Sequence, residues 1–119
     1  MVIKTKRVYD PPSPGDGQRI LVDRLWPRGI KKEKLKLSQW IRDVAPSDEL
    51  RKWFSHQSSK WEEFCDRYYQ ELENNPNAWK PILDAANAGN VTLLYSAKDE
   101  HRNNAVALKK YLGQKTGKD

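Results

Sequence analysis

The stretch ILVDRLWPRG, residues 20–29, decides the fold class that this chain predicts. Three apolar residues lead directly into an acid, two arginines and a tryptophan, in a segment constrained by Pro27 and Gly29. A short, continuous apolar run is typical of a buried strand, and the polar residues after it indicate a loop at the strand's carboxyl end. Ligands of open α/β sheets bind beyond the carboxyl ends of the strands. We therefore expect a binding site in the loop that begins at Asp23.

A second segment, VTLLY at residues 91–95, repeats this order of strand, polar loop and helix. The loop covers residues 96–104, and apolar residues at helical spacing follow it up to Leu112. Further strands are expected over residues 2–9 and 37–44, although neither face of the second segment is cleanly apolar. Residues 10–17 hold three prolines and two glycines, so we expect a loop there.

Three helices are expected between these strands. Ser47 is a good N-cap for the first, and Ser59 opens a capping-box pattern for the second, which extends to Leu72. The third runs from about Trp79 to Ala88. Strands that alternate with helices predict an α/β fold. We expect a single domain over residues 1–113, with a small, mostly parallel sheet of about three to four strands covered by helices, and a flexible Lys-rich tail over 114–119.

Composition narrows the class of protein further. The single cysteine excludes an internal disulfide, and no apolar run approaches the roughly 20 residues that span a bilayer. No signal-peptide pattern follows Met1. We therefore expect a soluble, cytoplasmic protein without membrane contact. The net charge of +6 permits attraction to nucleic acids or to anionic metabolites without selecting either.

The loop after residue 22 supplies the first candidate site. Arg24 and Arg28 can bind a carboxylate or phosphate through paired hydrogen bonds, and Asp23 can orient one arginine or act as a base. Arg51, from the first helix, can reach the same crevice, and Trp26 is a candidate ligand contact. The alternative is a structural ion pair that holds the loop, with Trp26 as a core or lid aromatic.

The loop after residue 95 supplies the second candidate site. Asp99 and His101 are candidate acid–base groups, Asn104 is a candidate ligand-orienting residue, and the helix that follows presents free backbone N–H groups to an anion. The alternative, which the sequence favours for Asp99, is that it caps the helix that follows. The chain has two histidines and no recognisable metal-ligand spacing, so no metal site is predicted and any cofactor is unknown.

Two broader hypotheses remain beside a small-anion or nucleotide-type pocket, which we rank first. Basic clusters at residues 31–36 and 109–118 suggest a nucleic-acid-binding module whose affinity falls steeply with salt. A protein-binding module without chemistry is the third reading. The chain has no Gly-rich phosphate loop, no G-x-S-x-G motif and no C-x-x-C motif. Whether the protein is an enzyme, and its oligomeric state, stay open at this point.

Several motifs resemble one family across roughly residues 3–113. They are the segments at residues 22–29, 45–54, 61–64, 91–99 and 103–105. In this order they resemble the YeaO-like family of prokaryotic proteins, a domain of unknown function. The resemblance implies a compact α/β fold and a cytoplasmic protein, without an established activity. Some members of the wider superfamily carry cysteines around the last strand; Tyr95 and Ser96 stand there in this chain, so no thiol or metal role is carried over.

Overall fold

The computed structural model describes residues 2–116. Its centre is a four-stranded sheet with the order β1-β4-β2-β3, in which every neighbouring pair is parallel. The strands are β1 (Ile3–Arg7), β2 (Gln18–Leu21), β3 (Gln39–Trp40) and β4 (Val91–Tyr95). The predicted α/β class and parallel sheet are confirmed.

β4 occupies the interior of the sheet, and all five of its residues are buried. A strand with neighbours on both sides and covered faces reads as a continuous apolar run, which explains the sequence VTLLY. β2 enters the sheet beside it through Gly17, whose φ is 64°. A Cβ atom at this position would lie 2.1 Å from the carbonyl oxygen of Asn90, so only glycine fits where these two strands begin.

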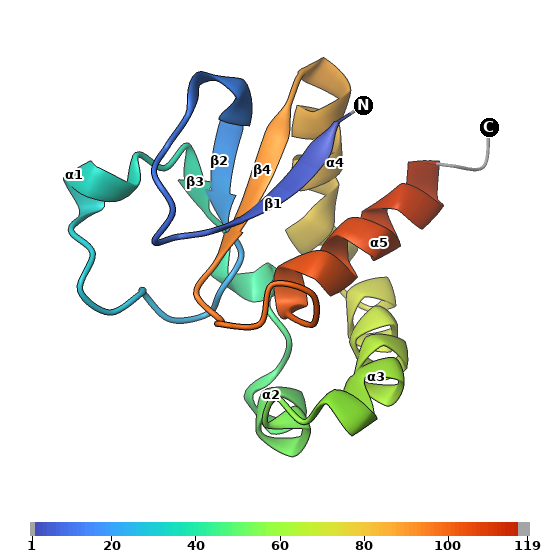
Figure 1. Cartoon of the computed structure of the whole chain (residues 1–119). Helices are drawn as coiled ribbons and strands as arrows, with labels where there is room; N and C mark the ends of the chain where they lie inside the picture. The colour runs from blue at the N-terminus through green and yellow to red at the C-terminus, as the bar shows by residue number, and fades with distance from the viewer. Residues whose placement is uncertain (1, 117–119) are drawn as a thin grey trace.

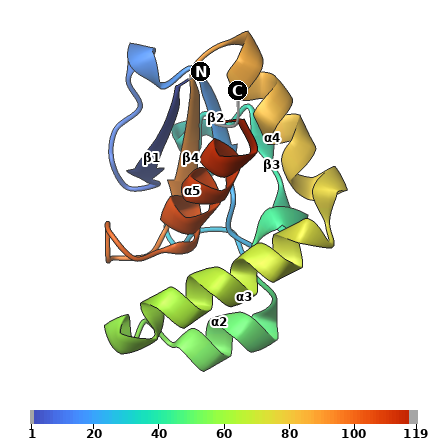
Figure 2. The ribbon, with the colours of Figure 1, turned by 90° about the vertical axis from the view of Figure 1, so that its right-hand side faces the viewer.

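The helices are α1 (Lys32–Leu35), α2 (Asp48–Phe54), α3 (Trp61–Glu73), α4 (Pro76–Ala88) and α5 (Asn104–Thr116), with short 3-10 turns at Pro14–Asp16, Arg42–Val44 and Ser58–Lys60. α4 and α5 pack on one face of the sheet, while α2 and α3 lie side by side at the carboxyl end of the strands (Figures 1 and 2). In the described part of the chain, none of these helices is long and apolar enough to cross a membrane.

Three boundaries differ from the sequence expectations. The strand expected over residues 37–44 is limited to Gln39–Trp40, because the chain turns into a 3-10 helix at Arg42. α4 begins at Pro76 and not at about Trp79. Proline is tolerated in the first turn of a helix, because the backbone N–H that it lacks would have no partner within the helix there. α5 continues to Thr116, so it includes the first residues of the segment expected as a tail. Residues 117–119 lie outside the described residues, and the tail there stays a prediction.

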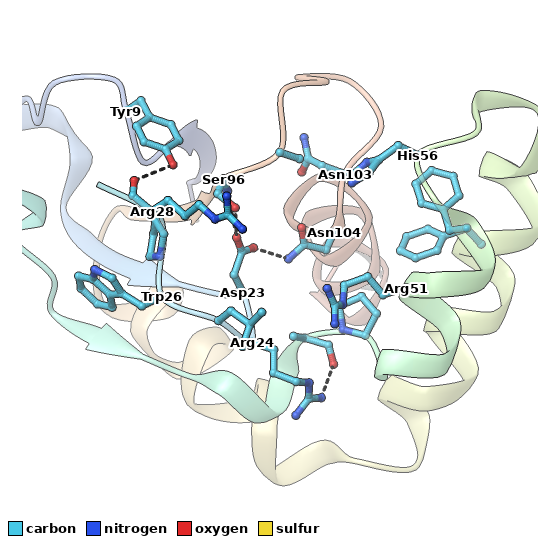
Figure 3. A pocket seen from close by; sticks show the side chains of 17 residues that line it. Tyr9, Asp23, Arg24, Trp26, Arg28, Arg51, His56, Ser96, Asn103 and Asn104 are labelled. Carbon is cyan, nitrogen blue, oxygen red and sulfur yellow. Dashed lines mark hydrogen bonds between the residues drawn. The ribbon is translucent and has the colours of Figure 1, made fainter. Parts of the chain in front are cut away.

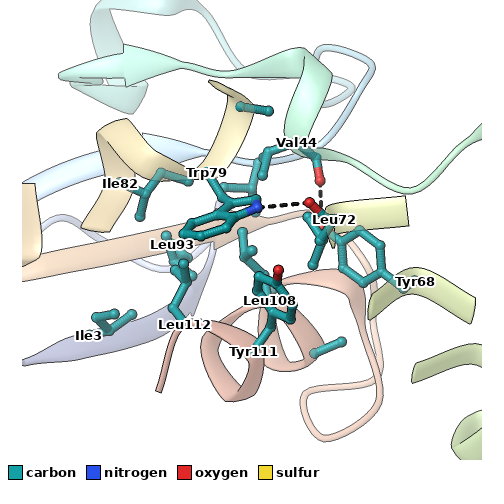
Figure 4. Close-up of a cluster of buried hydrophobic side chains, with 14 of the residues drawn as sticks. Ile3, Val44, Tyr68, Leu72, Trp79, Ile82, Leu93, Leu108, Tyr111 and Leu112 are labelled. Atoms are coloured by element: carbon teal, nitrogen blue, oxygen red, sulfur yellow. Dashed lines mark hydrogen bonds between the residues drawn. The ribbon is translucent and has the colours of Figure 1, made fainter. Parts of the chain in front are cut away.

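The main core lies between the sheet and α2–α5. It includes Ile20 of β2. Figure 4 shows Ile3 and Leu93 from the strands together with Leu108 and other apolar side chains of the helices. Two buried polar atoms in this region find backbone partners: the Tyr68 hydroxyl donates to the carbonyl of Val44, and the Trp79 indole donates to that of Leu72. A smaller cluster on the opposite face of the sheet, built around Leu21, Leu35 and Leu94, is covered by the loop that contains α1.

A buried ionic cluster lies where β2 begins. Asp16 is 2% exposed, and its carboxylate accepts hydrogen bonds from Lys6, Arg19 and Ser13. The Arg19 guanidinium, also buried, donates to the carbonyls of Leu35 and Lys36. Burial alone would raise the pKa of Asp16, but the hydrogen bonds outweigh it and hold that pKa well below its usual range. The cluster therefore links the start of β2 to the carboxyl end of α1.

Candidate functional site

A cavity of about 360 Å³ opens at the carboxyl ends of the strands. This volume falls within the range of natural small-molecule sites. It is bounded by the loops after β1, β2 and β4 and by the α2–α3 pair (Figure 3). Its lining residues are Tyr9, Asp23, Arg24, Leu25, Trp26, Pro27, Arg28, Ala45, Pro46, Arg51, Phe54, His56, Phe64, Ser96, Ala97, Asn103 and Asn104.

Asp23 joins the two predicted site loops. One carboxylate oxygen accepts hydrogen bonds from the backbone N–H of Ser96 at 3.0 Å and from its hydroxyl at 2.7 Å. The other accepts from the Asn104 side-chain amide at 3.0 Å, and the same amide donates to the carbonyl of Val22. These hydrogen bonds are possible because β2 and β4 are neighbours in the sheet, which brings the loops after them together. We call Asp23 a clamp, because its carboxylate links the two loops through hydrogen bonds.

Three arginines line the cavity, and they differ in how many hydrogen bonds and ion pairs their guanidinium groups make within the protein. Arg24 donates to the carbonyl of Ala45 at 3.3 Å, while its buried Nε has no hydrogen-bond partner in the structure. Arg51 pairs with Asp48 at 2.8 Å, and the same carboxylate oxygen of Asp48 lies 3.9 Å from the Arg24 Nε. The guanidinium of Arg28 makes no hydrogen bond or ion pair with any residue in the described part of the chain; only its carbonyl is engaged, by the Tyr9 hydroxyl. In Figure 3 the Arg28 and Arg51 side chains extend toward the middle of the site from opposite sides.

The wall formed by α2 and α3 is apolar. Phe54 and Phe64 are buried, and their rings stack with centroids 4.5 Å apart. Pro46 and Ala45 are buried beside them, and Leu25 stands 65% exposed on the loop after β2. The cavity therefore combines guanidinium groups with hydrophobic surface.

The structure brings together six of the residues that the sequence predicts for a site, namely Asp23, Arg24, Trp26, Arg28, Arg51 and Asn104. Trp26 is fixed by its own contacts: its indole donates to the carbonyl of Ile30, and its ring packs edge-on against Trp40. Figure 3 shows the ring directed away from the middle of the site.

Asp99 and His101 do not line the cavity. The Asp99 carboxylate accepts hydrogen bonds from the backbone N–H groups of His101 and Arg102, and these bonds lower its pKa. The cap of α5 is instead Asn103, whose side-chain oxygen accepts from the N–H of Val106 at 3.0 Å. His101 is exposed in this turn. The catalytic roles of Asp23, Asp99 and His101 stay predictions.

Sequence reasoning missed Tyr9, the phenylalanine pair and His56 as cavity residues. His56 has a φ of 55° and follows Ser55 with a φ of 44°, so two residues in the left-handed region turn the chain after α2. The histidine ring lies 5.9 Å from that of Phe54. The position of His56 at a helix end was visible in the sequence, but helical periodicity does not show which helix end faces a sheet edge.

Within residues 2–116, no group of three or more His, Cys, Asp or Glu side chains could hold a metal ion. Cys65 is buried on α3, and burial raises the pKa of its thiol to about 11. The lysines at residues 31–36 are exposed around α1, and Lys109 and Lys110 are exposed on α5. None of these lysines lines the cavity, and Lys118 lies outside the described residues. Nucleic-acid binding by these clusters stays a prediction.

The fold and the site together define a parallel α/β protein with an arginine-lined cavity at the carboxyl ends of its strands. The chain belongs to the family described as the inactive DUF488-N3 subclade, whose model matches residues 2–119.

The chain is 46% identical over 112 residues to the uncharacterized protein YeaO of Escherichia coli K12, which covers 94% of this chain and 97% of that protein. It is 48% identical over 73 residues to uncharacterized proteins of Mycobacterium bovis and Mycobacterium tuberculosis, covering 61% of this chain and 62% of theirs. No solved structure gives a significant match. The YeaO-like resemblance seen in the sequence is thus confirmed.

Proposed function

We propose that this protein binds a small anion, such as a phosphate or carboxylate compound, in the cavity at the carboxyl ends of β2 and β4. The observation that carries the proposal is the Arg28 guanidinium, which borders the cavity with no partner among the described residues. A guanidinium presents a planar set of donors that matches a carboxylate or phosphate. An anion in the cavity would supply hydrogen-bond acceptors for the Arg28 guanidinium, which no described residue supplies.

The charge balance of the cavity supports the same conclusion. Its lining contains three arginines and one carboxylate, that of Asp23. Because Asp23 already accepts three hydrogen bonds from Ser96 and Asn104, it does not compete for Arg28. The buried Arg24 Nε makes no hydrogen bond, and its ion-pair partner Asp48 lies 3.9 Å away, so it adds a second donor beside the cavity. A buried donor without an acceptor is costly, and an anion bound near the Arg24 Nε would remove that cost, while the exposed Arg28 guanidinium would exchange water for the anion.

Binding without turnover fits the cavity better than catalysis. Asp23 is the one carboxylate in the lining, and its hydrogen bonds to Ser96 and Asn104 leave it poorly placed to act as a base. The matching family is also described as inactive. We place this binding function in the cytoplasm, as the sequence suggests.

Replacing Arg28 with alanine is expected to abolish anion binding at this site. A ligand present at 100 times its dissociation constant should stabilise the native protein by about 2.7 kcal/mol. A thermal-shift screen with phosphate, sulfate, small carboxylates and AMP measures this effect in the native protein and in Arg28→Ala. Arg67→Ala is the control, since it removes an equal charge from the exposed face of α3, where Arg67 pairs with Glu63. Unchanged affinity in Arg28→Ala, or no response to any anion, would refute the proposal.

A further inference from the structure

We infer that the ligand of this cavity is an anion that carries a planar aromatic ring, rather than a bare inorganic oxyanion. This inference rests on the proposed anion-binding function and narrows the class of ligand. It comes from the hydrophobic part of the lining, which the arginines do not explain.

The first observation is the exposure of hydrophobic side chains at the rim. Among the described residues, the large hydrophobic side chains left exposed are Val2, Tyr9 and Leu25, and two of these three line the cavity. Leu25 is the most exposed at 65%. Its two neighbours in the chain are anchored by their side chains, because the Arg24 guanidinium donates to the carbonyl of Ala45 and the Trp26 indole donates to that of Ile30. Leu25 is therefore presented to solvent by an anchored loop, and exposed apolar surface beside a cavity indicates a binding surface.

The second observation is the wall opposite Arg28. The stacked rings of Phe54 and Phe64, together with Pro46, give the cavity an apolar side that a hydrated oxyanion would not use. A flat ring attached to the anion would gain van der Waals contact with this wall, and it would release water from the exposed Leu25 at the rim. The cavity volume of about 360 Å³ also suits an organic ligand.

The third observation is the backbone at His56. Glycine adopts a positive φ more readily than other residues, yet the chain places Ser55 and His56 at two successive positive φ values. The turn therefore retains an imidazole at the cavity, 5.9 Å from the Phe54 ring. Among residues with side chains, histidine is enriched in this conformation. A flat, polar ring at the rim is suited to lie against a second aromatic ring.

Calorimetric titration with four probes tests the inference: inorganic phosphate, ribose 5-phosphate, phenyl phosphate and AMP. We expect phenyl phosphate and AMP to bind at least about tenfold more tightly than phosphate or ribose 5-phosphate. Leu25→Ser should weaken the two aromatic probes about three- to tenfold and leave inorganic phosphate unchanged. Val2→Ser is the matched control, because Val2 is an exposed hydrophobic residue outside the cavity lining.

The outcomes separate this inference from the proposed function. Equal affinity for all four probes, lost in Arg28→Ala, would overturn the aromatic ligand class and leave anion binding intact. Tighter binding of aromatic probes that Leu25→Ser does not affect would also overturn it, because the ring would then lie elsewhere. If no probe binds and no anion of the wider screen does, both proposals fail.

Discussion

Replacing Asp16 with alanine is expected to lower the free energy of unfolding by about 3–5 kcal/mol, the amount typical of breaking a buried ion pair from one side. The carboxylate is nearly inaccessible and receives hydrogen bonds from Lys6 at 2.8 Å and from Arg19 at 2.5 Å. Removing it leaves the Arg19 charge buried with backbone carbonyls as its remaining partners. Urea unfolding followed by circular dichroism measures the loss.

Asp84→Ala serves as the control for this variant, because Asp84 is exposed on α4. A surface substitution of this kind should change stability by no more than about 0.5 kcal/mol. Equal stability of the two variants would show that Asp16 is not the centre of the ionic cluster.

The same cluster should make stability depend on acid pH. The pKa of Asp16 is lower in the folded protein than in the unfolded chain, so its contribution is fully present above the unfolded value of about 3.9. Protonation of the unfolded state removes that contribution progressively as the pH falls from about 5 toward the folded pKa. Unfolding free energies measured between pH 6 and 3 should therefore fall more steeply for the native protein than for Asp16→Asn. Parallel curves would contradict the prediction.

Asp23→Ala is expected to lower the free energy of unfolding by about 2–4 kcal/mol, because hydrogen bonds to a charged group contribute about 1.5–3 kcal/mol each and are not fully additive. The substitution removes the acceptor of three hydrogen bonds from Ser96 and Asn104. The loops after β2 and β4 then lose the link that closes one side of the cavity. Denaturant unfolding gives the stability change.

Two further variants identify the cause of that loss. Ser96→Ala removes the 2.7 Å bond but keeps the backbone donor, so it should cost less than Asp23→Ala. Asp99→Ala removes a carboxylate that bonds only within its own turn, and its effect should be smaller still. A larger loss from Asp99→Ala than from Asp23→Ala would disprove the role of Asp23 as the clamp between loops.

Part of the candidate site was predictable, because polar residues follow the two buried strands at the edge of the sheet where ligands of such folds bind. Residues 20–22 and 91–95 read as buried strands, and each is followed by polar residues. Once the two strands are parallel neighbours, their loops must meet at one edge. The contribution of α2 and α3 could not be predicted in this way. Phe54 and Phe64 appear in the sequence as core residues of amphipathic helices, and only the packing of those helices places them beside the arginines.

The boundary errors have local causes. Apolar and polar residues do not alternate cleanly over residues 37–44, so the sequence does not show where the strand ends. The last hydrogen bond between β3 and β2 runs from the N–H of Ile41 to the carbonyl of Leu21, after which the chain turns. The helix expected from about Trp79 begins instead at Pro76, because proline is compatible with the first turn of a helix.

The sequence by itself determined the α/β class, the buried strands and the arginine-bearing loop, because apolar periodicity and turn residues act over a few neighbouring positions. Tertiary structure alone decided which polar groups are satisfied and which are left free. The Asp23 carboxylate accepts hydrogen bonds from residues 73 and 81 positions away, while the guanidinium of Arg28, close by in sequence, has no partner among the described residues. Such pairings depend on the order of strands in the sheet, which is set by the packing of the whole core and not by any local segment.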